Sequence, residues 1–172
     1  QNALGNIFLS GTENKTLSKG YGKNKFWRAR NMSSPIVFSD NIIYSDDTGT
    51  IINLNLHGKR KWKKNIYSKA YKKIHKNLTF AIYEGSVYIA DNIGFIYVVN
   101  LEDGSLTWIK NHGIPFRSKI KVIDNKIFLT NQDNRILCFD VKTGLKIWDI
   151  RAVKSFIKSQ NYFSGMAISK EK

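Results

Sequence analysis

The 172-residue sequence predicts an all-β fold built from repeated units, and three observations lead to that prediction. A Gly-x-x-x-Trp pattern occurs three times, ending at Trp62, Trp108 and Trp148. Between these marks, short runs of β-branched and aromatic residues alternate with Asp, Asn and Gly, as in strands joined by tight turns. No long window shows the apolar periodicity of an amphipathic helix. A repeat of roughly 40 residues marked by tryptophan predicts one β-propeller blade per unit.

Each unit contains the signals of four antiparallel strands. Three strands alternate with turns, and a fourth strand carries the tryptophan that closes the unit. Asn, Asp and Gly fill the turns because they tolerate the positive φ that tight hairpins need. In chain order, the predicted strands that precede the three tryptophan strands are 35–38, 42–44, 50–55, 80–83, 87–90, 95–100, 120–123, 127–130 and 135–140.

The repeats also predict the organisation of the chain. We expect residues 1–26 to form a tail or incomplete strands, residues 27–150 to form three blades, and residues 151–172 to begin a further blade or a C-terminal extension. Closed propellers need about 4–8 blades, so three complete blades, with the start of another, make a partial ring. We therefore expect either a piece of a longer propeller or a half-propeller that forms a homodimer.

The repeated tryptophans and glycines are interpreted as structural residues. A tryptophan that closes one blade can pack between that blade and the next, which buries a large aromatic surface. We therefore expect the three tryptophans to be largely buried. The residues assigned to blade packing are Trp62, Trp108, Trp148, Gly58, Gly104 and Gly144.

The third unit resembles the blade motif of the pyrroloquinoline-quinone-type propeller repeat family, Ala-x-Asp-x-x-Thr-Gly-x-x-x-Trp. Residues 138–148 fit every position except the first, which is Cys138. Residues 98–108 keep the spacing with Asn100 in place of Asp, and the unit that ends at Trp62 is one residue shorter.

Two further segments, 33–35 and 45–49, look like the propeller lipoproteins of the bacterial outer-membrane β-barrel assembly machinery. That resemblance implies a non-catalytic scaffold in the periplasm that binds a protein partner, a subunit of the assembly machinery. It also implies association with the outer membrane only through a lipid anchor, and we expect that anchor to be absent from this chain.

Two alternative functions remain open. The same repeat occurs in quinoprotein dehydrogenases, and that resemblance implies a whole ring, bound calcium, a catalytic acid and often a pair of adjacent cysteines. This chain has one cysteine, Cys138, so we expect no cofactor, no metal, no catalytic residues and no enzymatic activity. The second alternative is a propeller that binds a polyanion or a sugar, because the net charge is +15.

The charged and metal-ligating residue types have structural interpretations too. The dense basic run 59–64 is interpreted as a solvated strand face, and no nucleic-acid-binding signature accompanies it, so no specific nucleic-acid partner is expected. His57, His75 and His112 lack the spacing of metal ligands and are predicted to lie on the surface. The aspartates of the hairpins are predicted to bind backbone amides.

Partner-binding residues are expected in the connections between blades, at 63–79, 109–119 and 149–161. Loops carry most of the binding residues of such scaffolds. The candidates in these connections are Tyr67, Tyr71, Phe116, Arg117, Phe156 and Lys158.

Overall fold

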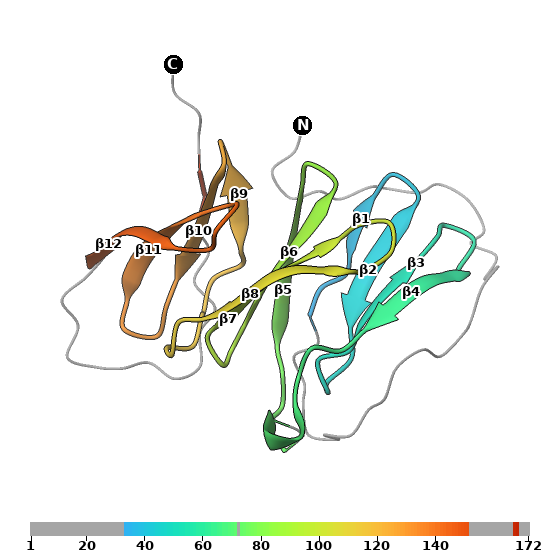
Figure 1. The fold of residues 1–172 in the computed structure, drawn as a ribbon, viewed down its shortest axis with the longest axis horizontal. Coiled ribbons are helices and arrows are strands. Elements are labelled where there is room, and N and C mark those ends of the chain that lie inside the picture. Colours follow the sequence, from blue (N-terminus) through green and yellow to red (C-terminus); the bar gives the residue numbers. More distant parts are fainter. Residues whose placement is uncertain (1–32, 72, 152–166, 169–172) are drawn as a thin grey trace, which may run out of the picture.

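The computed structural model describes residues 33–71, 73–151 and 167–168, and it shows three four-stranded antiparallel sheets that follow one another along the chain (Figure 1). The strands of each sheet are neighbours in sequence order. The bounds are β1 Ile36–Phe38, β2 Asn41–Ser45, β3 Ile51–Leu54 and β4 Arg60–Lys64; β5 Leu78–Tyr83, β6 Ser86–Asp91, β7 Phe95–Asn100 and β8 Leu106–Asn111; β9 Lys121–Ile123, β10 Lys126–Thr130, β11 Arg135–Asp140 and β12 Lys146–Arg151.

The prediction of an all-β fold with four-stranded propeller blades is confirmed. Within the described residues the helical structure is one short 3-10 turn, η1 (Lys69–Tyr71), in the connection between the first two blades. None of the helical structure described is long and apolar enough to cross a membrane. Each blade also has the same irregularity, a shift of register where the third strand meets the tryptophan strand. Such a bulge bends and twists the strand pair locally.

The first two blades are joined by Trp62 of β4, which lies against Gly104 in the turn after β7. A Cβ atom at Gly104 would stand 2.7 Å from the Trp62 ring, so the indole occupies the space that a side chain would need. The indole Nε1 donates a hydrogen bond to the carbonyl oxygen of Leu101, at 2.8 Å. Gly104 has φ +70°, a left-handed conformation that glycine adopts readily.

Trp108 of β8 repeats this contact with the third blade. A Cβ atom at Gly144 would lie 2.6 Å from the Trp108 ring, and the Trp108 Nε1 donates to the carbonyl oxygen of Val141 at 3.1 Å. The glycines of the second and third Gly-x-x-x-Trp patterns, Gly104 and Gly144, therefore receive the tryptophan of the preceding blade, and Trp108 of the second pattern in turn contacts the following blade.

Trp148 differs from the prediction of burial, since 38% of its surface is exposed. Ile147 and Ile150 beside it on β12 are exposed as well. The physical reason is that the described part of the chain holds no fourth blade whose glycine turn would cover the indole. The residue that would contact Gly58 in the same way, Trp27, lies outside the described residues.

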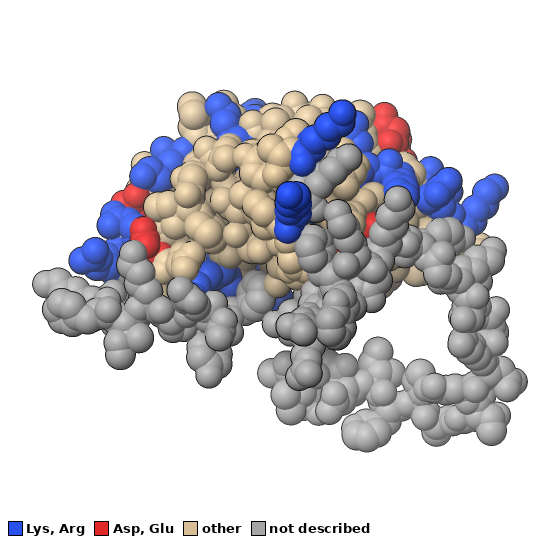
Figure 2. Space-filling model, turned by 90° about the horizontal axis from the view of Figure 1, so that it is seen from below, with Lys and Arg blue, Asp and Glu red and all other residues tan. Residues whose placement is uncertain are grey.

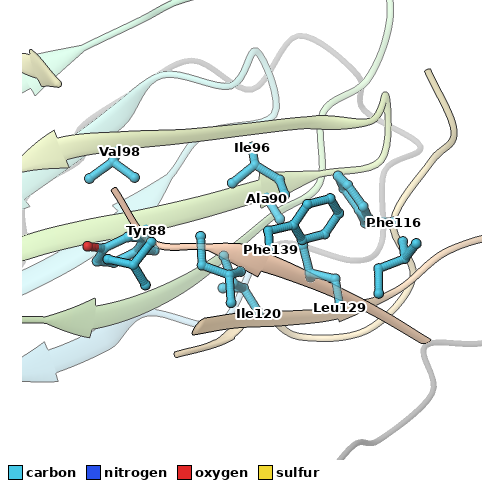
Figure 3. Packing of buried hydrophobic residues seen from close by; sticks show 11 residues of the cluster. Tyr88, Ala90, Ile96, Val98, Phe116, Ile120, Leu129 and Phe139 are labelled. Carbon is cyan, nitrogen blue, oxygen red and sulfur yellow. The ribbon is translucent and has the colours of Figure 1, made fainter. Parts of the chain in front are cut away.

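The apolar cores lie between the blades. One cluster joins the first and second blades around Ile43, Trp62 and Tyr97. The other joins the second and third blades, where Ile96 of β7 lies near Phe139 of β11 (Figure 3). Because each core is shared by two sheets, a blade depends on its neighbour for most of its buried apolar surface.

Replacing a tryptophan that is packed between two blades should destabilise the protein far more than replacing a tryptophan that is exposed. Trp62→Ala removes a buried indole, 7% exposed, and its hydrogen bond to Leu101, so we expect a loss of about 3–5 kcal/mol in unfolding free energy. Trp148→Ala should lose about 1 kcal/mol. Equilibrium unfolding in urea measures both, and equal losses would contradict the proposed blade contact.

The space taken by the Trp62 indole can be tested with two glycines of matched backbone conformation. Gly104 has φ +70° and Gly85 has φ +69°, but a Cβ atom at Gly85 would meet nothing within 4 Å. Both changes to alanine strain the backbone, whereas only Gly104→Ala also overpacks the indole. We expect Gly104→Ala to lose about 1–3 kcal/mol more stability than Gly85→Ala. Thermal unfolding of the two variants side by side provides the measurement.

Candidate functional site: the connection rim

The strand order sorts the turns of the three blades onto two rims. Turns between first and second strands, and between third and fourth strands, lie on the rim that we call the turn rim. The hairpins between second and third strands, and the connections between blades, lie on the opposite rim, at the lower edge of Figure 1, which we call the connection rim. The connection rim consists of segments 46–50, 65–77, 92–94, 112–120 and 131–134.

Each hairpin of the connection rim is closed by an equivalent Asp or Asn side chain. Oδ1 of Asp91 accepts hydrogen bonds from the amides of Ile93, Gly94 and Phe95 at 2.8–2.9 Å. Asp46 in the first blade and Asn131 in the third accept from two backbone amides each, in the same pattern. The prediction that the hairpin aspartates bind backbone amides is confirmed for Asp46 and Asp91, and it explains why acidic residues recur here.

The connection between the first and second blades is attached to the second blade by Tyr67. Its hydroxyl donates to Oδ2 of Asp91 at 2.5 Å, so the hairpin carboxylate also holds the connection. The Tyr67 ring makes edge contacts with Phe95 and Tyr97, with centroids 6.2 and 6.4 Å apart. It also fills the space over Gly49 in the first blade, where a Cβ atom would lie 2.3 Å from the ring.

Burial governs the proton positions in this contact. Asp91 is 2% exposed, and burial raises the pKa of its carboxyl although the Tyr67 hydroxyl and three amides favour the charged form. Burial, helped by Asp91 and Tyr97, raises the pKa of Tyr67 far above its ordinary value. The phenol therefore keeps its proton and acts as the donor.

Hydrogen bonds from two backbone amides hold the C-terminal end of the same connection. The Lys76 amide donates to the Asp47 carbonyl at 3.2 Å, and the Asn77 amide donates to Oδ1 of Asn92 at 2.8 Å. The Lys76 side chain is buried, with Nζ bonded to the carbonyl of Tyr71 and 5.1 Å from the centroid of the Tyr67 ring. The long connection is thus tied to both blades and presents a defined surface.

The second connection, 112–120, inserts between the second and third blades. Phe116 is 5% exposed and packs in the core beside Phe139. The Arg117 amide donates to the carbonyl of Thr130 at 2.8 Å. Its side chain is half-buried, and one guanidinium nitrogen, Nη2, is buried with no hydrogen-bond partner among the described residues.

His112 was predicted to lie on the surface, and that prediction is wrong. The imidazole is half-buried, its centroid lies 4.4 Å from that of Phe139, and burial lowers its pKa. His112 follows Trp108 by four positions, as Ile66 follows Trp62, and Ile66 packs against the core of the first two blades. Comparing the two units at this position would have indicated a buried residue.

The candidate partner-binding residues occupy different environments. Tyr67 and Tyr71 are half-buried and support the first connection, with Tyr71 also packed on Phe95 at 5.4 Å. Phe116 belongs to the core, so the expectation that it offers a contact surface is wrong: the connection folds back between the blades at this point. Arg117 reaches the surface. Phe156 and Lys158 lie outside the described residues.

The described residues do not provide the donor set of a metal-dependent quinone site. Among them, no group of three or more His, Cys, Asp or Glu side chains is arranged to hold a metal ion. Cys138 is buried in β11, and burial raises the pKa of its thiol. The hairpin carboxylates Asp46 and Asp91 are already engaged by backbone amides.

Comparison with protein families gives a match over residues 7–163 to the family described as outer membrane protein assembly factor BamB. An uncharacterized protein of Rickettsia conorii is 28% identical over 119 residues, which is 64% of this chain and 28% of that protein. The chain therefore spans less than a third of the length of this relative.

Two solved structures share the fold. BamB from Moraxella catarrhalis aligns with a TM-score of 0.58 at 19% identity, over 71% of this chain and 37% of that one. The quinohemoprotein alcohol dehydrogenase ADHIIG from Pseudomonas putida HK5 aligns with a TM-score of 0.57 at 17% identity, over 69% of this chain and 20% of that one. At these identities the likeness concerns the fold alone.

The hydrogen bond between Tyr67 and Asp91 should contribute measurably to stability. Tyr67→Phe removes the phenolic donor, so the buried Oδ2 of Asp91 loses this hydrogen bond. We therefore expect the free energy of unfolding to fall by about 1–3 kcal/mol. Tyr83→Phe is the matched control, because its hydroxyl makes an exposed 3.3 Å contact with Asn125, and it should lose less than about 0.5 kcal/mol. Similar values in urea unfolding would mean that the buried hydrogen bond is not a significant attachment.

Proposed function

Because the chain belongs to the family of outer membrane protein assembly factor BamB, we propose that it is a non-catalytic propeller scaffold that binds a protein subunit of the outer-membrane assembly machinery. We propose further that it works in the periplasm, associated with the outer membrane. The family match supports the class of partner, and the fold supports a binding role, since propeller blades present loops on rigid sheets.

The position of the partner-binding surface is inferred from the hydrogen bonding of the Arg117 guanidinium. A buried guanidinium N–H without an acceptor is unfavourable, because the group has lost water and gained nothing in return. The side chain is half-buried on the connection rim, so Nη2 would meet a partner once the side chain turns outward. We propose that a carboxylate or carbonyl group of the partner accepts this hydrogen bond on binding, which would make Arg117 an anchor of the interface.

The dehydrogenase alternative is supported by the shared fold with quinohemoprotein enzymes. A shared propeller does not carry activity by itself, because function lies in the site and not in the fold. The carboxylates of the described hairpins serve their own backbone, so the binding role accounts for more of the observed geometry.

The apolar face of the third blade around Trp148 is exposed, and an adjacent blade would bury it. We propose that the surface around Trp148 is covered by a further blade or by a second copy of this chain, which would supply the glycine turn that the other tryptophans contact. This proposal concerns assembly of the ring and is independent of Arg117.

Arg117→Ala should weaken partner binding selectively. The test is the dissociation constant between the full chain and the periplasmic part of the barrel-forming assembly subunit encoded by the same genome, measured by surface plasmon resonance. We expect at least about 30-fold weaker binding, the range for truncating a buried charged hydrogen bond. The control, Arg151→Ala, removes the same charge from an exposed residue at the end of β12.

Arg151→Ala should change the dissociation constant by less than about threefold, as for an exposed charge. Equal weakening by both variants would mean that net charge and not Arg117 drives binding. No binding by the unmodified chain would refute the proposed partner class. The melting temperature of each variant checks that the fold is intact.

A further inference from the structure

The two rims of the propeller differ in charge. The basic residues in the segments of the connection rim are Lys69, Lys73, Lys76, Arg117 and Lys119. Of these basic residues Lys76 is buried, and of the three acidic residues in the same segments Asp46 and Asp47 are buried and Asp133 is partly accessible. The accessible charges of these segments are therefore Lys69, Lys73, Arg117 and Lys119 against Asp133. Strands that begin or end at this rim add Lys64, Lys121, Arg135 and Arg151, of which Arg135 is ion-paired with Asp149.

The turn rim has the opposite character. Its turns carry five exposed acidic residues against two lysines, Lys59 and Lys142. Basic residues at strand ends bring this rim close to charge balance, so the positive field of the described blades is concentrated on the connection rim. The five acidic residues are Asp40, Glu84, Glu102, Asp103 and Asp124.

The first connection is the most prominent part of the basic rim. It extends below the hairpins in Figure 1, where η1 lies at its lower end. Lys69 and Lys73 are exposed there, and Ile74, the residue that follows Lys73, is 42% exposed. Figure 2 looks onto this rim from below and shows Lys and Arg side chains around an uncharged central area, with few Asp or Glu side chains in view.

We propose that the connection rim docks on an anionic lipid surface, with Lys69 and Lys73 on the headgroups and Ile74 at the boundary of the acyl chains. The charges are spread over segments of three blades, which suits a broad surface better than a single bound ion. Lysines act as hydrated point charges that need no fixed partner geometry. An exposed apolar side chain beside them adds the second contribution that membrane-surface binding uses.

This docking goes beyond the proposed protein partner and does not depend on it. Arg117 lies on the second connection, whereas the lipid contact centres on the first. The docked orientation turns the nearly charge-balanced turn rim, with its five exposed acidic residues, away from the membrane, which agrees with repulsion between carboxylates and anionic headgroups.

Sedimentation with lipid vesicles tests the proposal on the full chain. Vesicles of phosphatidylcholine mixed with phosphatidylglycerol should bind the chain, vesicles of phosphatidylcholine alone should not, and added salt should release it. The double change Lys69→Glu with Lys73→Glu should weaken binding by at least about 30-fold. The control, Lys59→Glu with Lys142→Glu, makes the same change of net charge on the turn rim and should weaken it by less than about threefold.

Two further results complete the test. Ile74→Ser leaves the net charge unchanged and should weaken binding to the anionic vesicles. Salt-resistant binding of the unmodified chain to neutral vesicles would refute the proposal. Equal losses in the two double variants would refute it as well, because they would show attraction by net charge without a docking face. If polyglutamate binds through Lys69 and Lys73 while the anionic vesicles do not bind, the face recognises an acidic protein segment and the lipid proposal is wrong.

Discussion

The contact between a tryptophan and the glycine turn of the following blade is the interaction on which the remaining structure depends. A four-stranded antiparallel sheet of this size cannot bury enough apolar surface alone. Trp62 and Trp108 each place a large ring across the gap between two sheets and fix its position with an indole hydrogen bond. Gly104 and Gly144 are required at the receiving positions, because any side chain would occupy the volume of the ring.

That constraint fixes the spacing of the blades and therefore the positions of the connections between them. The first connection can be held by Tyr67 and Asp91 only because the two sheets are already in place. The second connection inserts Phe116 into a core that both blades share. The rim that carries the proposed contacts is thus a product of blade packing, because its two connections are held in place by the neighbouring sheets.

The repeated elements could be predicted from the sequence, whereas the connections could not. Strands and hairpins recur with a fixed spacing, so three copies reinforce one another, and the Gly-x-x-x-Trp pattern identifies the packing residues. Tyr67 has no counterpart in the second connection, where Gly113 stands at the equivalent distance from the tryptophan. Phe116 was misjudged because a connection is normally a surface segment. The burial of Trp148 depends on a neighbour that the described residues do not include.

The second blade carries both a receiving glycine, Gly104, and a tryptophan that packs on the next blade, Trp108, and this pairing bears on how such proteins can change in evolution. A blade of this kind holds both halves of the same contact, one half for the blade before it and the other for the blade after it. Duplication of one unit within a gene would therefore yield a blade that already fits between its new neighbours, without compensating substitutions. Loss of one unit would likewise rejoin matching surfaces. The connections, which carry no such paired requirement beyond their attachment residues, are free to diverge in charge and length, so new binding specificities can arise while the ring is conserved.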